Sequence, residues 1–370
     1  MSHAAAGLAQ VETQWLFTRD DLAQTPSVMG EAAPSKGGAA PTMTSAQERV
    51  LRAKGVRLIC KMCEFLQVGQ HVVTTAATYF HRFYMRRPLQ QARNGPGWSH
   101  YEIAAACVFL ACKMEESLRK LPVVVDATMA SLDKSPEGQM RWADRSFRSN
   151  HASHEYTKWR DCILLHEEVL LTTLCFDMVV PQPHEVLVRA TRSLEVETEV
   201  ARLAWTVLND CLRDPTCILY DAPVLAAGAF KKACLARRVD PAMHYAARPR
   251  DATPVPPEED YLDWLDVFDV DEAEAQDALE AIDRDVYEFH LPLQAPRAAK
   301  PRDAGETKEL APHSVSVTEP DDSVVEPAAP AAAAAPAAAA SADGPTVEAV
   351  DEPLRKPSTP VSRESGELSS

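Results

Sequence analysis

The chain has 370 residues, of which 46% are hydrophobic and 25% are charged, and its formal net charge is −16. This length predicts two domains of ordinary size plus additional chain. No G-x-G-x-x-G or G-x-x-x-x-G-K-[ST] pattern occurs, which argues against a glycine-rich phosphate loop. The longest strongly apolar run, 104–112, is too short to span a bilayer, and no signal peptide is expected.

The negative charge is concentrated toward the C-terminus. From residue 251 onward there are 28 acidic and 8 basic residues, a net charge of −20. That leaves 26 acidic and 30 basic residues, a net charge of +4, for the first 250. Because the part expected to fold is nearly neutral, the composition does not fit a strongly basic nucleic-acid-binding protein.

Helical periodicity dominates the chain, whereas strand-like alternation is rare. The predicted helices cover 45–66, 71–85, 101–116, 120–130, 155–175, 184–193, 197–213, 222–238, 258–268 and 272–288. Three pairs have the spacing of a capping box at a helix start: Ser45 with Glu48, Ser99 with Glu102, and Asp271 with Glu274. The class predicted from these patterns is all-α.

Three stretches are expected to lack regular structure. Residues 27–43 are rich in Gly, Ala, Ser and Pro, and 131–153 form a polar loop that contains Ser135-Pro136. Residues 291–370 contain a long alanine run with scattered proline and acidic residues, so the sequence predicts a disordered acidic Ala/Pro-rich tail.

Two segments, 103–112 and 222–235, are apolar on nearly every face. A helix without a polar face must be surrounded by other helices. We therefore expect two similar bundles of about five helices, each with its third helix in the centre, joined near Pro181 and Pro183. The predicted divisions are an N-terminal segment with a short helix (1–43), a first bundle (44–180), a second bundle (181–290) and the tail (291–370).

No catalytic or metal-binding motif stands out. The sequence contains no H-E-x-x-H and no recognisable nucleophile motif. The nine cysteines have no regular spacing, and Cys60-x-x-Cys63 is not followed by a second pair at a zinc spacing. Reduced, buried thiols in an intracellular protein are the simplest interpretation. We therefore predict no catalytic residues, no cofactor and no metal.

Two charged residues lie in unusual places, because Lys113 ends a very apolar helix and Glu167 lies inside another. A charge in such surroundings is costly unless it is paired or reaches an edge. If the two helices pack side by side, Lys113 and Glu167 form a pair within an apolar patch, suited to gripping the end of a partner helix. The alternative is that both side chains extend into solvent and do nothing specific.

Several motifs resemble the cyclin family. Residues 110–116 (LACKMEE) resemble the third helix of a cyclin box, and 166–177 resemble its fifth helix, with Glu167 nine residues before Phe176. The subgroup most similar is that of the transcriptional cyclins of the K and T type. Three segments carry that similarity, namely QWLFTRDDL at 14–22, YFHRFYM at 79–85 and AWTVLNDCL at 204–212.

The resemblance implies two tandem five-helix cyclin boxes with flanking N- and C-terminal helices. It also implies a nuclear, non-catalytic subunit that activates a cyclin-dependent kinase acting on the C-terminal repeat domain of RNA polymerase II, which promotes transcription elongation. The kinase would be a direct partner and the polymerase an indirect one, without direct DNA or membrane binding. Carried over by motif position, the kinase-binding residues are Lys113, Glu167, Leu110, Met114, Glu116, Leu171, Phe176 and Met178.

Other cyclin-box proteins remain as alternatives. A cyclin of the L, C or H type would serve splicing, Mediator or TFIIH. A DNA-binding factor of the TFIIB kind has the same fold, but it needs a basic face and normally a zinc ribbon, which this sequence does not show. The first helix also lacks the substrate-docking motif of cell-cycle cyclins, which puts docking of that kind in doubt.

Overall fold

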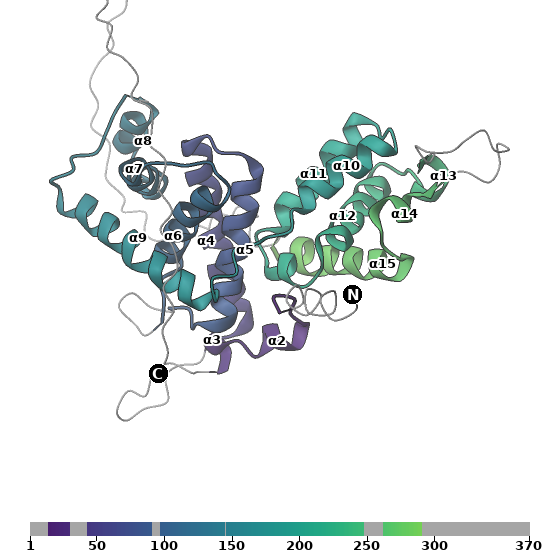
Figure 1. Cartoon of the computed structure of the whole chain (residues 1–370), viewed down its shortest axis with the longest axis horizontal. Coiled ribbons are helices and arrows are strands. Elements are labelled where there is room, and N and C mark those ends of the chain that lie inside the picture. The colour runs from purple at the N-terminus through teal and green to yellow at the C-terminus, as the bar shows by residue number, and fades with distance from the viewer. Residues whose placement is uncertain (1–13, 30–42, 91–96, 145, 248–261, 291–370) are drawn as a thin grey trace, which may run out of the picture. The chain divides into compact units, whose positions relative to one another are not determined.

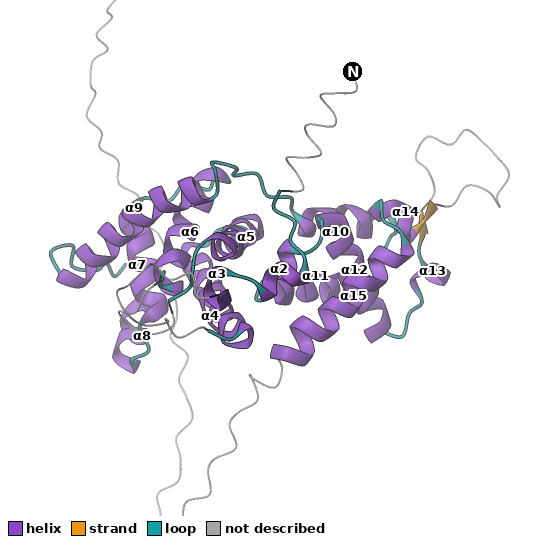
Figure 2. Ribbon diagram, turned by 90° about the horizontal axis from the view of Figure 1, so that it is seen from below, coloured by secondary structure: helices purple, strands orange, loops and turns teal. Residues whose placement is uncertain are grey.

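The structure is a computed structural model that describes residues 14–29, 43–90, 97–144, 146–247 and 262–290. All of these residues belong to one compact unit. The predicted tail, 291–370, and most of the stretch 27–43 lie outside the described residues. Within the described residues the predicted all-α class is confirmed, since the strands amount to one two-residue pair (orange in Figure 2).

The first bundle surrounds one apolar helix. This helix, α6, packs against α4, α5, α7 and α9 (Figure 1), and every residue from Ile103 to Cys112 is buried. The predicted central position of this helix is therefore confirmed. The elements up to this point of the chain are α2 (Arg19–Ala23), α3 (Pro26–Met29), α4 (Ser45–Leu66), α5 (Gln70–Arg86), α6 (His100–Met114), α7 (Leu121–Leu132), α8 (Pro136–Ala143) and α9 (His154–Thr173).

The second bundle repeats this arrangement around α12, which packs against α10, α11, α14 and α15. Helix α12 packs tightly against its neighbour at Gly228, where an added Cβ would lie 2.7 Å from the Cβ of Ala278. The elements are α10 (Pro183–Ser193), α11 (Thr198–Cys211), the 3-10 helix η1 (Pro215–Ile218), α12 (Ala222–Ala236), α13 (Pro241–His244), β1 (Ala246–Ala247), β2 (Leu262–Asp263), α14 (Trp264–Phe268), α15 (Glu272–Ala281) and the π-helix η2 (Ile282–Glu288).

Two predictions about helix extent are wrong. The predicted loop 131–153 contains α8, because Ser135 accepts a hydrogen bond from the Gly138 N–H and Pro136 occupies the first helical turn. This pattern is a good helix start as well as a turn signal. The predicted helix 258–268 is also too long, because residues 262–263 form a strand and only 264–268 of the described part are helical.

The three predicted capping boxes have different outcomes. Asp271 and Glu274 form theirs, which confirms that prediction. At α4 the box is one residue earlier and joins Thr44 to Gln47. Ser99 does precede α6, but its side chain makes no capping hydrogen bond.

A segment before the first bundle contacts both bundles. Trp15 is buried, and its ring N–H donates to Asp177 at 2.9 Å. The Phe17 N–H donates to the Ile218 carbonyl at 2.9 Å, and Arg19 forms an ion pair with Asp285. Residues 14–19 therefore fasten the first bundle to the second.

Buried polar groups also join the two bundles. Asp214, which follows α11, accepts hydrogen bonds from Arg49 of α4 at 2.9 Å and from His290 at 3.0 Å. Burial alone would raise the pKa of the Asp214 carboxyl, but the His290 hydrogen bond and the Arg49 charge outweigh it and hold that pKa below its ordinary value. The His81 Nε2 atom lies 3.0 Å from the Leu212 carbonyl oxygen. The predicted division at residue 180 stays a prediction.

Candidate functional site

The predicted pair of unusual charges is present. The Lys113 Nζ atom lies 2.6 Å from Glu167 Oε1 and joins the last turn of α6 to the middle of α9. The Lys113 side chain is 41% exposed and that of Glu167 is 15% exposed. The two charges therefore meet at the edge of the bundle, where both can still reach a partner.

Local sequence explains the position of Lys113. A cation in the last turn of a helix is favoured by the partial negative charge of the helix C-terminus. Phe109, one turn earlier, places its ring centroid 4.1 Å from the Lys113 Nζ atom, within the range of a cation–π contact. These contacts pre-orient the ammonium, although an ion pair this exposed contributes at most about 1 kcal/mol to folding stability.

Two apolar side chains from the predicted set are well exposed near the ends of α6 and α9. Met114 directly follows Lys113 and is 45% exposed. Phe176, which follows α9, is 68% exposed and has a φ of +58°, a left-handed conformation uncommon for a bulky residue. A large aromatic ring held in solvent by such a backbone is unusual for a residue whose only purpose is packing.

The remaining predicted residues differ in exposure. Leu171 and Met178 are partly buried against the first core, and Glu116 is exposed at the end of α6 with a φ of +53°. Leu110 is only 2% exposed, so it lies in the core and does not supply the contact area expected of it. Its place on the face of α6 one turn before Met114 makes it a support for this surface.

Sequence reasoning missed four exposed apolar side chains in the same part of the chain, namely Leu118, Leu164, Leu165 and Val179. Leu164 lies three residues before Glu167, with Leu171 four residues after, so all three share one face of α9. This helical spacing in the sequence could have identified Leu164 as a neighbour of the predicted site. We define the charge-centred surface as Lys113, Glu167, Met114, Leu164 and Phe176.

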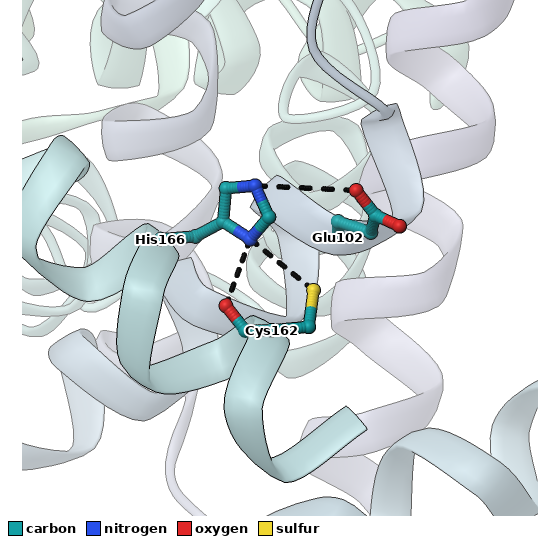
Figure 3. Close-up of side chains that lie close together, drawn as sticks. All are labelled: Glu102, Cys162 and His166. Carbon is teal, nitrogen blue, oxygen red and sulfur yellow. Dashed lines mark hydrogen bonds and ion pairs between the residues drawn. The ribbon is translucent and has the colours of Figure 1, made fainter. Parts of the chain in front are cut away.

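A second cluster in the first bundle brings together Glu102, Cys162 and His166 (Figure 3), whose ligand atoms all lie within 4.8 Å of one another. This cluster could not be predicted from spacing along the chain, because Glu102 is 60 residues from Cys162. Among the described residues, no helix is long and apolar enough to cross a membrane.

Comparison with known protein families identifies one domain of the chain. Residues 39–179 match the family model of the cyclin N-terminal domain. Residues 39–179 therefore carry a cyclin N-terminal domain. The matched segment carries both α6 and α9, so the Lys113–Glu167 pair is a feature of this cyclin domain.

The similar curated proteins include cyclins of the T type. The chain is 33% identical to cyclin pch1 of Schizosaccharomyces pombe over 225 residues, which is 60% of this chain and 58% of that protein. It is 30% identical to cyclin-T1-2 of Arabidopsis thaliana over 61% of this chain and 44% of that protein. For cyclin-T1 of Homo sapiens the identity is 28%, over 60% of this chain and 27% of that protein. The chain thus matches less than two thirds of the length of each relative.

One solved structure supports the fold. The yeast RNA Pol II CTD kinase CTDK-1 complex contains a chain that superposes with a TM-score of 0.51 at 14% identity, covering 75% of this chain and 73% of that one. At this identity the similarity concerns the fold. The arrangement predicted from the resemblance, with cyclin-box bundles in an all-α protein, agrees with it.

Proposed function

We propose that this chain is a cyclin, the regulatory subunit of a cyclin-dependent kinase that phosphorylates the C-terminal repeat domain of RNA polymerase II and promotes transcription elongation. The observation that carries the proposal is the paired Lys113 and Glu167, still partly exposed and accompanied by exposed Met114 and Phe176 on the cyclin domain. The cyclin-T relatives support the choice of substrate.

The charge-centred surface has the parts needed to hold a helix of the kinase. A helix end presents unsatisfied N–H or C=O groups, which the Glu167 carboxylate and the Lys113 ammonium can bind. The exposed apolar side chains supply area that is removed from water upon docking. The charges thereby set the register, while Met114, Leu164 and Phe176 provide most of the binding free energy.

Such docking would activate the kinase by a shift in population. A kinase is active when its regulatory helix completes the Lys–Glu ion pair that positions ATP. A cyclin that binds only this orientation of the helix shifts the kinase toward it. In this proposal the cyclin acts in the nucleus and contributes no catalytic group, and the polymerase is reached only through the kinase.

The test is co-purification of the full chain with its kinase from the native host, followed by an assay on peptides of the polymerase repeat. We expect a one-to-one complex that phosphorylates these peptides. Identification of the kinase by mass spectrometry also distinguishes the alternatives, because cyclins of the L, C or H type would bring different kinases. A wild-type chain that recovers no kinase would end the proposal.

The surface itself is tested by a charge swap, Lys113→Glu with Glu167→Lys. The swap keeps the attraction within the cyclin but reverses the polarity offered to the kinase, so folding is retained while binding should weaken at least about tenfold. The matched control is Lys231→Glu with Glu272→Lys, which swaps an ion pair of the second bundle. If the first swap binds as tightly as the control, the assignment of the surface is wrong although the function can still hold.

A further inference from the structure

Glu102, Cys162 and His166 form a compact cluster away from the end of α6 that carries Lys113. Cys162 and His166 are one turn apart on α9, and Glu102 reaches them from the first turn of α6 (Figure 3). His166 is buried, whereas Glu102 and Cys162 are partly exposed. The cluster therefore bridges two core helices at a place that solutes can reach.

The contacts of His166 decide its tautomer. Its Nδ1 atom lies 2.8 Å from the carbonyl oxygen of Cys162, which can only accept a hydrogen bond. The proton of the neutral ring is therefore on Nδ1, and Nε2 carries a free lone pair. This is the usual state of a histidine that binds a metal through Nε2, with its other nitrogen held by a backbone carbonyl.

The free Nε2 atom faces an unsuitable neighbour. Glu102 Oε2 lies 3.9 Å away, and both atoms are hydrogen-bond acceptors. Two acceptors that face each other across a partly buried gap are stabilised by a positive species between them. A proton on Nε2 would serve, and so would a metal ion bound by both atoms.

Of these two positive species, the nearby thiol of Cys162 favours a metal ion over a proton. Its Sγ atom lies 3.2 Å from His166 Nδ1, and it is within 4.8 Å of the Glu102 carboxylate. A sulfur, an imidazole nitrogen and a carboxylate oxygen make up a donor set that zinc accepts in proteins. We propose that Glu102, Cys162 and His166 bind a zinc ion, with water as the fourth ligand.

The charges and dimensions are compatible with zinc. A thiolate and a carboxylate together neutralise Zn²⁺, while the proton of the thiol passes to solvent. Zinc lies about 2.0 to 2.3 Å from such ligands, so tetrahedral ligand atoms are about 3.3 to 3.8 Å apart. The Nε2–Oε2 separation of 3.9 Å is close to this. Cys162 Sγ lies beside Nδ1 rather than Nε2, so the Cys162 and Glu102 side chains, both partly exposed, would have to rotate toward Nε2 to complete the site.

The experiment is zinc titration of the full chain after treatment with a chelator, followed by calorimetry and elemental analysis. We expect one zinc per chain at this site and a rise of the melting temperature upon zinc addition, because the ion joins α6 to α9. Cobalt should give a thiolate charge-transfer band that Cys162→Ser removes. The readouts do not depend on kinase binding, so failure here is independent of the proposed function.

Two variants separate metal binding from folding. In His166→Asn the amide can still donate to the Cys162 carbonyl, but no group replaces Nε2, so zinc affinity should fall at least about tenfold. Glu102→Gln places an amide N–H opposite Nε2, so without zinc the chain should be at least as stable as wild type, while zinc binding weakens. The control is Cys60→Ser, which tests the separate Cys60-x-x-Cys63 pair.

Three outcomes would overturn the proposal. The first is a wild-type chain that binds no zinc, in which case a proton on His166 holds the cluster together. The second is equal zinc affinity for wild type and His166→Asn. The third is loss of zinc with Cys60→Ser but not with Cys162→Ser, which would place the ion elsewhere.

Discussion

The two bundles are built alike, but their central helices end differently. In the first, the lysine at the end of α6 pairs with Glu167 while Met114 and Phe176 stay exposed. In the second, Lys231 of α12 pairs with Glu272 of α15, and Lys232 pairs with Asp283 of η2. Among the described residues of the second bundle, Leu235 is the one large apolar side chain that is exposed. The difference indicates that, among the described residues, the bundle frame occurs twice whereas most of the exposed large apolar side chains lie outside the second bundle.

The largest expected effect is a loss of stability, which should be much greater for a substitution in α4, the first long helix of the first bundle, than for one in α10, the first helix of the second. Glu48 and Arg52 of α4 form a buried ion pair in which Arg52 also donates to the His81 carbonyl. Glu48→Ala leaves the buried guanidinium without its counter-charge, so the free energy of unfolding should fall by about 3–5 kcal/mol. Urea denaturation measures this fall. The exposed Arg192→Ala in α10 should change it by less than about 0.5 kcal/mol. Equal effects would show that the buried pair has no special role.

A pH dependence tests the junction between the bundles. Burial, with a smaller contribution from the Arg52 charge, lowers the pKa of His81 to about 3 from an ordinary 6.5. Between these two pKa values, His81 is therefore protonated in the unfolded chain but neutral in the native state. The stability contributed by neutral His81 is complete above pH 6.5 and falls by about 1.4 kcal/mol per pH unit below it.

The variant His81→Gln keeps an amide N–H that can donate to the Leu212 carbonyl but removes the titration. Between pH 6.5 and 4 its free energy of unfolding should decline less steeply than that of wild type, by about 1.4 kcal/mol per pH unit. Urea denaturation at several pH values gives both slopes. His184, whose pKa burial lowers to about 4, is retained in both proteins and adds the same slope to each. Identical slopes would mean that His81 is protonated in the native state.

A smaller effect on stability is expected where α12 packs against α15 in the second bundle. Gly228→Ala places a methyl group 2.7 Å from the Cβ of Ala278, so α12 and α15 must separate. The free energy of unfolding should fall by about 1–3 kcal/mol. Thermal denaturation measures the change. Adding Ala278→Gly removes the clash and should recover part of the loss, whereas simple additivity of the two changes would contradict the contact.

The smallest effect on stability belongs to the charge-centred surface. Lys113→Ala should lower the free energy of unfolding by less than about 1 kcal/mol, because the pair is partly exposed. If the proposed function holds, the same variant should weaken kinase binding at least about tenfold, because it removes one of the two charges proposed to contact the kinase. Denaturation and affinity measurements on one preparation make the comparison. A large loss of stability would mean that Lys113 serves the fold.

Much of the fold could be predicted from the sequence because apolar periodicity reports burial directly. The central place of α6 and α12 follows from their lack of a polar face. Errors arose where one residue type suits two structures. Ser135-Pro136 fits a turn or a helix start, and Ser45 was preferred to Thr44 as the capping residue although both can cap.

The site could be predicted only in part. The apolar sequence surroundings of Lys113 and Glu167 pointed to their pairing. Helical spacing alone does not give the direction of the core, and the predicted contact residue Leu110 is buried. Leu164 was missed because an exposed leucine in an apolar helix looks like a core residue. The Glu102 cluster arises from tertiary packing, since its members come from two helices far apart in sequence.

Asp214 has a consequence for how the molecule can be divided. Its carboxylate accepts hydrogen bonds from Arg49 of the first long helix and from His290, the last described residue. A fragment that stops before His290 loses one of these donors, and a fragment of the first bundle alone leaves Arg49 without its acceptor. We therefore expect the two bundles to unfold as one cooperative transition, and expression fragments should begin before Trp15 and extend past His290.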